Sequence, residues 1–329
     1  MAAEVTFIMP AYNAAEYIGE AIASIRRQTA GCWKLIVVDD GSTDATRKIA
    51  QTIAEEDSRI SVLAMDKGSG SAYQPRKKGI LSADTDWVAP LDADDWIEPD
   101  YLEKLIKRQE ATGADIVYPT MWRPAVGDAE ESLLTPGDNS LAQCVMPGKD
   151  WVRYTLDGWR INCNGGLIRK SLYRKAFETF DSSVTYSCAD ELLGRQLLTI
   201  TPRLAISDAK YFYRENAESI TRKKSVKLFD FLTNTQKLIP FVKNIYGSDS
   251  EEYRLVHWQN FHDYFDALRL LNRYEFSAED RQVAKNSISQ TRRMAELTLL
   301  KEEMSPRYEA LFRLPLGLAL VALRIFDRP

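Results

Sequence analysis

The segment PLDADDWIEPD, residues 90–100, places four aspartates and one glutamate in eleven positions, directly after a short apolar run. Carboxylates at this spacing repel one another and resist dehydration, so a folded chain keeps them in water or around a cation. A helix that starts near Pro99 explains the neighbouring acidic residues, because acidic side chains complement a helix N-terminus. It does not explain Asp92, Asp94 and Asp95. The residues alone therefore leave two interpretations open, a solvated loop and a metal site.

A second acidic motif, VVDDGSTD at residues 37–44, puts Asp39 and Asp40 at the end of an apolar run. The residues after Gly41 can cap a helix, but capping leaves the paired aspartates unexplained. A carboxylate at a strand end can accept hydrogen bonds from a nucleotide base or a ribose. The chain has neither G-x-G-x-x-G nor G-x-x-x-x-G-K-[ST], the usual phosphate cradles. Phosphate charge would then need another counter-ion, and a metal held by residues 92–95 could provide it.

Over the first 120 residues, runs typical of strands alternate with patterns typical of helices, and these elements must position the two motifs. Apolar runs typical of strands occur at residues 5–9, 34–38, 60–64, 86–91 and 115–119. Helical spacing of apolar residues occurs around residues 18–25, 49–53, 72–83 and after Pro99. This alternation predicts an α/β fold with a mainly parallel sheet flanked by helices. Ligands of such sheets bind beyond the carboxyl ends of the strands, which is where both acidic motifs fall.

The remaining chain predicts a second half and a helical extension. Residues 123–147 are rich in Pro, Gly, Asp and Ser and are interpreted as an irregular connection. Residues 149–220 mix helix with short strands, and the pattern becomes almost wholly helical from about residue 225. We therefore expect a domain over 1–222, with halves 1–120 and 121–222, followed by a helical region over 223–329.

Composition narrows the possible functions. The 329 residues carry a formal net charge of −4, which argues against nucleic acid as the main partner. The four cysteines form no C-x-x-C pair, so reduced thiols in a cytoplasmic protein are the simpler interpretation. The N-terminus lacks the pattern of a secretory signal. No run reaches the roughly 18 apolar residues of a membrane-spanning helix.

Three segments, in this order and spacing, resemble the inverting glycosyltransferases of family 2, which have the GT-A fold. They are VTFIMPAYNAAEYIGEAIASIRRQT, KLIVVDDGSTDAT and VAPLDADDWIEPDYL. The resemblance is strong over residues 4–120 and continues more weakly to about residue 221. It implies the transfer of a sugar from a nucleoside diphosphate sugar, most simply a UDP-sugar, to a hydroxyl of a growing glycan, as in bacterial surface polysaccharide synthesis.

The resemblance also assigns donor-binding roles by position. Pro10, Ala11 and Tyr12 match the segment that lines the nucleotide pocket. Asp39 matches the acid that hydrogen-bonds the base, with Asp40 as a candidate helper.

The metal-binding role is implied for the D-x-D motif formed by Asp92, Ala93 and Asp94. Its acids contact the ribose and the Mn²⁺ or Mg²⁺ that bridges the donor diphosphate, and Asp95 is a candidate helper. Oxygen ligands suit those hard ions. Arg76 matches a basic position near the diphosphate, although the Lys77 beside it departs from the usual asparagine.

Catalysis is implied for the segment SCADELLGRQLL, in which Asp190 takes the position of the base. Inversion requires a base that removes the proton of the acceptor hydroxyl. Capping of the following helix is the structural alternative for Asp190, and Glu191 is the rival base. Arg214, in YFYRENAESIT, matches a residue that approaches the diphosphate.

An acceptor region is implied for GWRINCNGGLIRKSLY, residues 158–173. Trp159 could stack on a sugar or pack in the interior. Asn164 and the Gly165-Gly166 pair would let the backbone approach a ligand closely.

The apolar tail RLPLGLALVALRIFDRP, residues 313–329, is too short to span a bilayer. Three uses of this tail remain open: peripheral contact with the inner face of the cytoplasmic membrane, packing within the helical region, and contact with another subunit of an oligomer. Two functions other than glycosyl transfer also remain open, a sugar-phosphate nucleotidyltransferase and a catalytically silent glycan-binding or scaffold protein. A lipid-linked glycan is the alternative acceptor.

Overall fold

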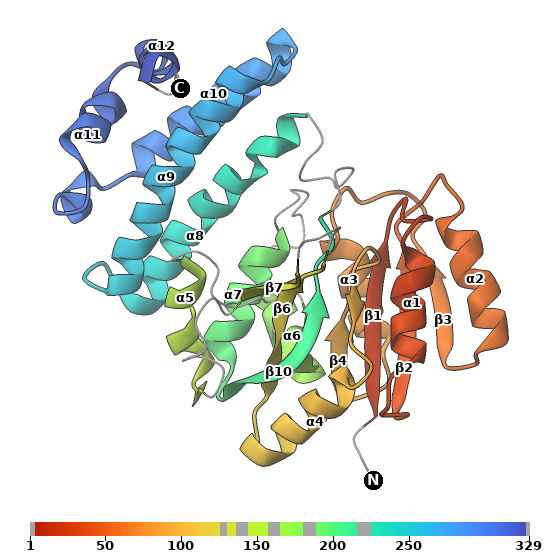
Figure 1. Cartoon of the computed structure of the whole chain (residues 1–329). Coiled ribbons are helices and arrows are strands. Elements are labelled where there is room, and N and C mark those ends of the chain that lie inside the picture. The colour runs from red at the N-terminus through yellow and green to blue at the C-terminus, as the bar shows by residue number, and fades with distance from the viewer. Residues whose placement is uncertain are drawn as a thin grey trace. The chain divides into compact units, whose positions relative to one another are not determined.

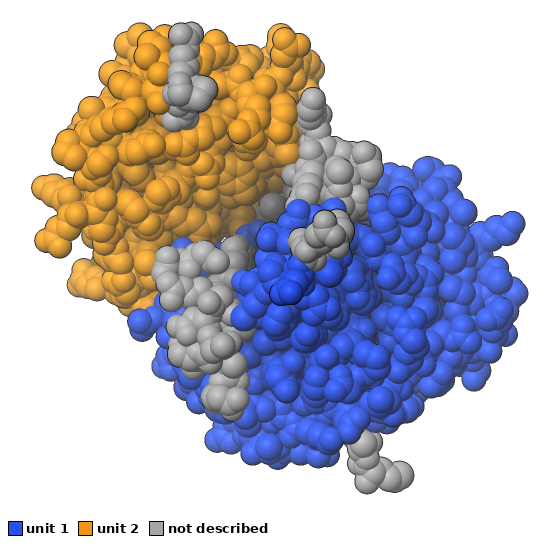
Figure 2. All heavy atoms as spheres, viewed as in Figure 1, with its two compact units in different colours: residues 1–185, 189–216 blue, residues 186–188, 217–329 orange. Residues whose placement is uncertain are grey.

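The computed structural model describes residues 4–125, 130–135, 144–156, 165–179, 189–215 and 225–326. These residues form two compact units, shown in different colours in Figure 2. The first contains the described residues up to Glu215, and the second contains those from Ser225 onward. The boundary expected at residue 222 lies outside the described residues, so the exact division of the chain stays a prediction.

A single sheet organises the first unit (Figure 1), in the strand order β3-β2-β1-β4-β9-β6-β10-β5, with β7 paired to β6 and β8 paired to β10. The strands are β1 Val5–Ala11, β2 Trp33–Asp39, β3 Ile60–Ala64, β4 Trp87–Pro90, β5 Trp96–Ile97, β6 Ile116–Arg123, β7 Ser132–Thr135, β8 Val145–Met146, β9 Leu167–Arg169 and β10 Leu204–Phe212. β1 is parallel to both β2 and β4, and β2 is parallel to β3. The carboxyl ends of these strands therefore share one edge of the sheet, and both acidic motifs lie at that edge.

Helices cover both faces of this sheet (Figure 1). They are α1 Ile18–Arg26, α2 Thr46–Glu56, α3 Tyr73–Ser82, α4 Tyr101–Thr112, α5 Arg153–Leu156, α6 Lys170–Thr179 and α7 Ala189–Ile200. All seven residues of β1 are buried, as expected for a strand covered on both sides. Phe7 and Met9 join the core with α1 and α4. Ile8 points to the opposite face, toward α3.

Gly79 sets how closely α3 approaches the sheet. A Cβ atom at this position would lie 2.7 Å from Cγ2 of Ile8 and 3.1 Å from Cγ2 of Val38. Because these distances are shorter than normal packing contacts, α3 lies against β1 and β2 only with glycine there. The same helix carries Arg76. The packing of Gly79 therefore fixes the distance between Arg76 and the strand ends.

The second half of the sheet is more mixed than the sequence pattern indicated. β9 lies antiparallel between β4 and β6, while β6 and β10 are parallel. The connection interpreted as irregular contains β7 and β8, two short strands that pair antiparallel with β6 and β10. Strands this short are defined by pairing with neighbours rather than by a sequence period, which explains why the pattern missed them.

The second unit is helical, as expected from the sequence. Its α-helices are α8 Asp230–Tyr246, α9 Glu251–Arg273, α10 Ala278–Met294, α11 Pro306–Arg313 and α12 Leu316–Phe326. Its core includes an aromatic group in which ring contacts join Phe261, Tyr264, Phe265 and Phe312. Across the described part of the chain, no helix is both long enough and apolar enough to cross a bilayer.

Candidate active site

The strand ends bring the expected nucleotide-binding residues together at one edge. Ala11 ends β1, Asp39 ends β2, and the two residues are register partners. Both are nearly inaccessible, at 3% and 2% exposure, whereas Tyr12 is 46% exposed. Of these three residues, Tyr12 therefore exposes the most surface, and its ring lies beside Gly68. Pro10 is buried within β1.

Asp40 connects two loops of the protein. Its carboxylate accepts hydrogen bonds from the Ser69 backbone N–H at 3.0 Å and from the Ser69 hydroxyl at 2.8 Å. Burial raises the pKa of Asp40 above its ordinary value, although the hydrogen bonds from Ser69 act in the opposite direction. Gly41 adopts φ +74°, and a Cβ atom there would lie 2.6 Å from the Gly68 nitrogen. Asp40 therefore stabilises the close contact between these loops.

Arg76 joins the D-x-D motif to the segment of the expected base. Its guanidinium donates from Nη2 to Oδ1 of Asp92 at 2.7 Å and from Nη1 to Oδ2 of Asp190 at 3.3 Å. The Arg76 side chain is only 4% exposed. Burial disfavours its charge, but the charges of Asp92 and Asp190 outweigh burial and hold the pKa of Arg76 above its ordinary value. Three residues that are distant in the sequence thus form one charged cluster.

The two candidate bases contact different partners. Asp190 contacts Arg76, as described above, whereas the carboxylate of Glu191 lies 3.4 Å from Nη1 of Arg195. Arg195 is fully buried and also donates to the hydroxyl and the carbonyl of Thr155. Burial raises the pKa of Asp190, although the positive charge of Arg76 acts in the opposite direction. Asp190 thus lies in the charged cluster, whereas Glu191 forms an ion pair with Arg195, four residues further along α7.

Asp95 is held by protein groups. It accepts a hydrogen bond from the Tyr211 hydroxyl at 2.6 Å and another from the Arg214 backbone N–H at 2.8 Å. The residue is 3% exposed, and burial raises its pKa well above the ordinary value, with further contributions from Asp94 and Asp92. Asp95 therefore fixes the end of β10 against the acidic motif.

Arg214 lies beside the acidic motif between two aromatic rings. Its guanidinium carbon is 4.5 Å from the ring centre of Trp96 and 5.1 Å from that of Tyr17. Nε of Arg214 donates to the backbone carbonyl of Asp94 at 2.8 Å, and the side chain forms an ion pair with Glu20. A cation fixed in this way next to the D-x-D motif can attract phosphate oxygens.

The donor set of the D-x-D motif fits a metal that is completed by its substrate. Among the described residues, no three acidic, histidine or cysteine side chains converge to form a ready-made cage. The Asp92 side chain is 28% exposed, and of its two carboxylate oxygens only Oδ1 has a hydrogen-bond partner within the described part of the chain. Mg²⁺-like ions often bind one or two carboxylates and take their other ligands from phosphate and water. Asp92 and Asp94 fit such a site, with Ala93 buried between them.

The expected acceptor segment is only partly described, because Trp159 and Asn164 lie outside the described residues. Gly166 has φ +98°, and a Cβ atom there would lie 2.4 Å from the carbonyl oxygen of Val117. A Cβ atom on Gly165 would lie 2.9 Å from the ring of Tyr211. Both glycines thus allow close packing within the protein, and the expected approach of a ligand to their backbone stays a prediction.

Some residues of the site were missed by the sequence analysis. Tyr211 orders Asp95, Trp96 and Tyr17 enclose Arg214, and Ser69 holds Asp40. Trp96 directly follows the acidic motif, which was an available signal. The contacts of Tyr17 and Ser69 depend on loop conformation, which no periodic pattern of residues predicts.

Comparison with known proteins decides the family. The model of glycosyl transferase family 2 matches residues 6–173, about half of the chain. The chain belongs to glycosyl transferase family 2. Among its relatives in sequence is the succinoglycan biosynthesis protein ExoO of Rhizobium meliloti, 40% identical over 113 residues. The match covers 34% of this family 2 chain and 32% of ExoO, so the chain spans about a third of that relative.

Solved structures share the fold of this family 2 member. S. aureus TarS 1–349 in complex with UDP-GlcNAc has a TM-score of 0.70 at 18% identity, covering 97% of this chain and 88% of that chain. The mannosyltransferase PcManGT from Pyrobaculum calidifontis, in complex with GDP-Man and Mn²⁺, has a TM-score of 0.54 at 14% identity, covering 100% and 89%. The expected GT-A fold and the expected family are confirmed.

Proposed function

We propose that this protein is a metal-dependent inverting glycosyltransferase that moves a sugar from a nucleoside diphosphate sugar to a hydroxyl of a growing glycan. The observation that carries the proposal is the contact of Arg76 with both Asp92 and Asp190. This contact supports the proposal because Asp92, of the proposed donor-binding motif, and Asp190, the proposed base, bind the same guanidinium. A reaction that joins a donor diphosphate to an acceptor hydroxyl needs these two groups close together.

The nucleotide would bind along the ends of β1 and β2. Asp39 is the proposed partner of the base, and the segment Pro10-Ala11-Tyr12 is the proposed wall of the pocket. The exposed ring of Tyr12 supports this role, because an accessible aromatic ring can stack on a base. A UDP-sugar is the proposed donor, and the UDP-GlcNAc complex of TarS, which has a similar fold, makes this class the first to test.

Asp92 and Asp94 would hold Mn²⁺ or Mg²⁺. A bound ion supplies charge neutralisation to the diphosphate leaving group. The residues of the chain perform the rest of the proposed chemistry. Arg76 and Arg214 would orient the phosphates, since guanidinium groups match phosphate geometry. The ring contacts and hydrogen bond of Arg214 support a fixed position for its charge.

Asp190 is the proposed general base. Its raised pKa supports the role, because a base works best when its pKa approaches the operating pH. Its carboxylate would accept the proton of the acceptor hydroxyl while that oxygen forms the new bond to the anomeric carbon. The bond from that carbon to the diphosphate oxygen breaks, and the nucleoside diphosphate leaves.

The proposed setting is bacterial surface polysaccharide synthesis, with a glycan or lipid-linked glycan as acceptor. The relationship to ExoO, which is named for succinoglycan biosynthesis, supports this setting. We also propose a cytoplasmic enzyme in peripheral contact with the membrane through residues 313–329. Membership in family 2 disfavours the nucleotidyltransferase alternative. It does not distinguish a catalytically silent glycan-binding protein, so the test must measure turnover.

The test is an assay of the full chain with UDP-, GDP-, dTDP- and CMP-sugars, Mn²⁺ and a panel of acceptors. We expect one donor class to give a β-to-α or α-to-β change of anomer and a free nucleoside diphosphate. Asp190→Asn should lower kcat by roughly 10²–10⁴-fold. Glu191→Gln is the matched control and should retain most activity. Pyrophosphate release from a nucleoside triphosphate and a sugar phosphate would overturn the proposal, as would metal-dependent donor binding without transfer.

A further inference from the structure

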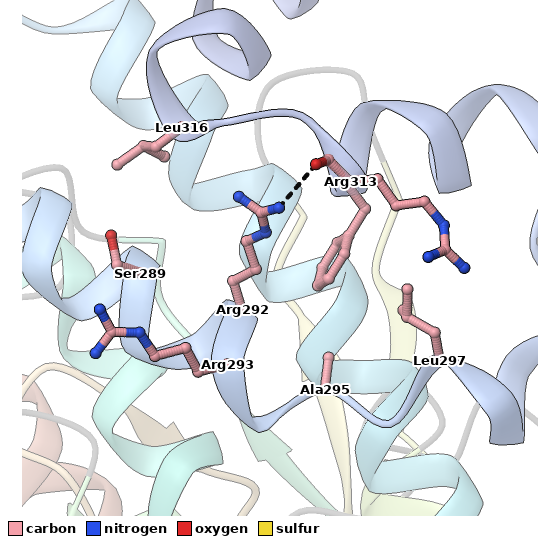
Figure 3. A pocket seen from close by; sticks show the side chains of 8 residues that line it. Ser289, Arg292, Arg293, Ala295, Leu297, Arg313 and Leu316 are labelled. Atoms are coloured by element: carbon pink, nitrogen blue, oxygen red, sulfur yellow. Dashed lines mark hydrogen bonds between the residues drawn. The ribbon is translucent and has the colours of Figure 1, made fainter.

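The helical unit contains a cavity that the proposed reaction does not use. Its volume is about 730 Å³, and it lies between the end of α10, the short helix η4 at Leu297–Leu300, the end of α11 and the start of α12. Figure 3 shows the side chains that line it. The lining residues are Ser289, Arg292, Arg293, Ala295, Leu297, Phe312, Arg313 and Leu316. We call this the arginine cavity.

The charge of the arginine cavity is positive. Three of its eight lining residues are arginines and none is acidic. Arg313 forms an ion pair with Glu309 at 2.7 Å. Arg292 donates to the backbone carbonyl of Arg313 at 2.9 Å, the bond drawn in Figure 3. Arg293 is exposed and has no ion pair within the described residues, and neither has Arg292. Two positive charges at the cavity therefore have no carboxylate partner among the residues that the structure describes.

An exposed apolar helix face begins beside this cavity. Leu316, the first residue of α12, lines the cavity, and Leu318 follows two positions later. Leu318, Val321 and Ile325 are spaced three and four residues apart and are 57%, 57% and 62% exposed. The other face of α12 packs into the helical core. Of the ten large apolar side chains exposed in the described residues, four lie on α12. Such clustering is unlike the scattered exposure of ordinary surfaces.

We infer that the arginine cavity and the exposed face of α12 together bind an anionic membrane surface, with a lipid phosphate in the cavity. A short helix with one apolar face, next to basic residues, has the composition of an interfacial helix. Arginine recognises phosphate through paired hydrogen bonds. The apolar lining at Leu297 and Phe312 suits the glycerol and acyl part of a lipid. The inference deepens the proposed membrane contact and rests on it.

Charge favours a lipid over a second copy of the chain. In a two-fold dimer through this face, the same patch meets itself, so that the unpaired arginines of both copies approach one another. Like charges brought together in this way are unfavourable. An anionic lipid surface instead neutralises them, and each basic residue near such a surface contributes separately to binding.

The test is sedimentation of the full chain with vesicles, without donor or acceptor, so that its outcome is independent of glycosyl transfer. We expect at least about tenfold tighter binding to phosphatidylcholine vesicles containing phosphatidylglycerol than to phosphatidylcholine alone. The double variant Arg292→Gln/Arg293→Gln, which removes the two arginines without a carboxylate partner among the described residues, should lose most of this difference. Arg293→Gln alone, at an exposed position, should lose part of it. Arg47→Gln/Lys48→Gln on α2 removes two exposed charges elsewhere and should bind like the wild type.

The apolar contribution is tested with Leu318→Gln/Val321→Gln/Ile325→Gln, which should reduce vesicle binding, while Val283→Gln, at an exposed position of α10, should not. Equal binding to both vesicle types would overturn the inference. So would calorimetric binding of inorganic phosphate with no vesicle binding, which indicates a soluble ligand. A dimer that dissociates in the α12 triple variant, again without vesicle binding, would assign the face to a second copy.

Discussion

The carboxylates of Asp92 and Asp190 share one guanidinium, with Arg76 at 2.7 Å from the first and 3.3 Å from the second. This shared contact couples the charge of the proposed donor-binding residue Asp92 to that of the proposed base Asp190. A change at Arg76 is therefore expected to affect both the binding of metal and donor at Asp92 and the pKa of Asp190, the proposed base.

Arg76→Gln tests this link. We expect kcat/KM to fall about 10- to 100-fold, since a hydrogen bond to a charged group contributes about 1.5–3 kcal/mol. Arg76 lowers the pKa of Asp190, so its loss should raise that pKa and protonate more of the base at neutral pH. The acid limb of the pH–rate profile should therefore move to higher pH. Arg76→Lys should move it less. An unchanged acid limb in Arg76→Gln would disconnect Arg76 from the base.

Asp94→Ala tests the proposed metal site without removing a partner of Arg76. We expect turnover to fall by more than about 100-fold, because metal stabilisation of a leaving group is worth several kcal/mol. EDTA should have a similar effect on the wild type, reversed by Mn²⁺. Asp208→Ala, at an exposed position of β10, is the matched control. Wild-type rates in Asp94→Ala would remove the motif from the reaction.

Arg214→Gln tests phosphate orientation. We expect the donor KM to rise about tenfold or more, as for other charged hydrogen bonds, with a smaller change in acceptor KM. The control is Arg123→Gln, which removes an exposed ion pair with Glu215, the residue that follows Arg214 in the sequence. If both variants raise the donor KM equally, the effect of Arg214 is not specific to its position.

Asp40→Asn tests the loop contact through the pH dependence of stability. Burial raises the folded-state pKa of Asp40, so the folded protein holds this proton more tightly than the unfolded chain. The stability of the wild type is therefore expected to decrease as the pH rises from the ordinary carboxyl pKa of 3.8 through the raised value. Asp40→Asn should flatten this part of the curve in urea unfolding measurements. A slope identical to that of the wild type would contradict the assignment.

Gly79→Ala tests the packing of α3. The added Cβ atom would overlap Ile8, and we expect a loss of about 1–3 kcal/mol in the free energy of unfolding. Gly19→Ala in α1 is the control, because no atom lies within 4 Å of its added Cβ. That variant should gain roughly 0.5–1 kcal/mol from helix propensity. A neutral Gly79→Ala would show that α3 can move away from the sheet.

Much of the first unit was predictable because its elements have strong periods. The expected strand at residues 60–64 coincides with β3, and the pattern at 72–83 encloses α3. The antiparallel insertion of β9 was not predictable, since three residues carry no period and their pairing is set by the whole sheet.

The candidate site was predictable at the positions that follow strands, where residue type alone indicates chemistry. Asp39, Asp92 and Asp94 were singled out in this way, and their roles stay predictions. The convergence of Asp190 with Arg76 was not, because it depends on where α7 packs. The hydrogen bond between Asp95 and Tyr211 was also missed. Tyr211 is distant in the sequence, and it comes near Asp95 only because β10 pairs with β5.

The loops after β1 and β2 are joined by hydrogen bonds within the protein. Asn13, in the left-handed region at φ +48°, accepts a hydrogen bond from the Thr43 backbone at 2.9 Å, and its own N–H donates to Ser42 Oγ at 3.0 Å. The Ala14 N–H donates to Thr46 Oγ1 at 2.7 Å. These bonds order the loop during folding, so little conformational entropy remains to be lost when a nucleotide arrives. Selection of the nucleotide base by these two loops would then depend on a loop conformation that the protein adopts by itself. The same selection is expected for a free nucleoside, which lacks the diphosphate that would reach the acidic cluster.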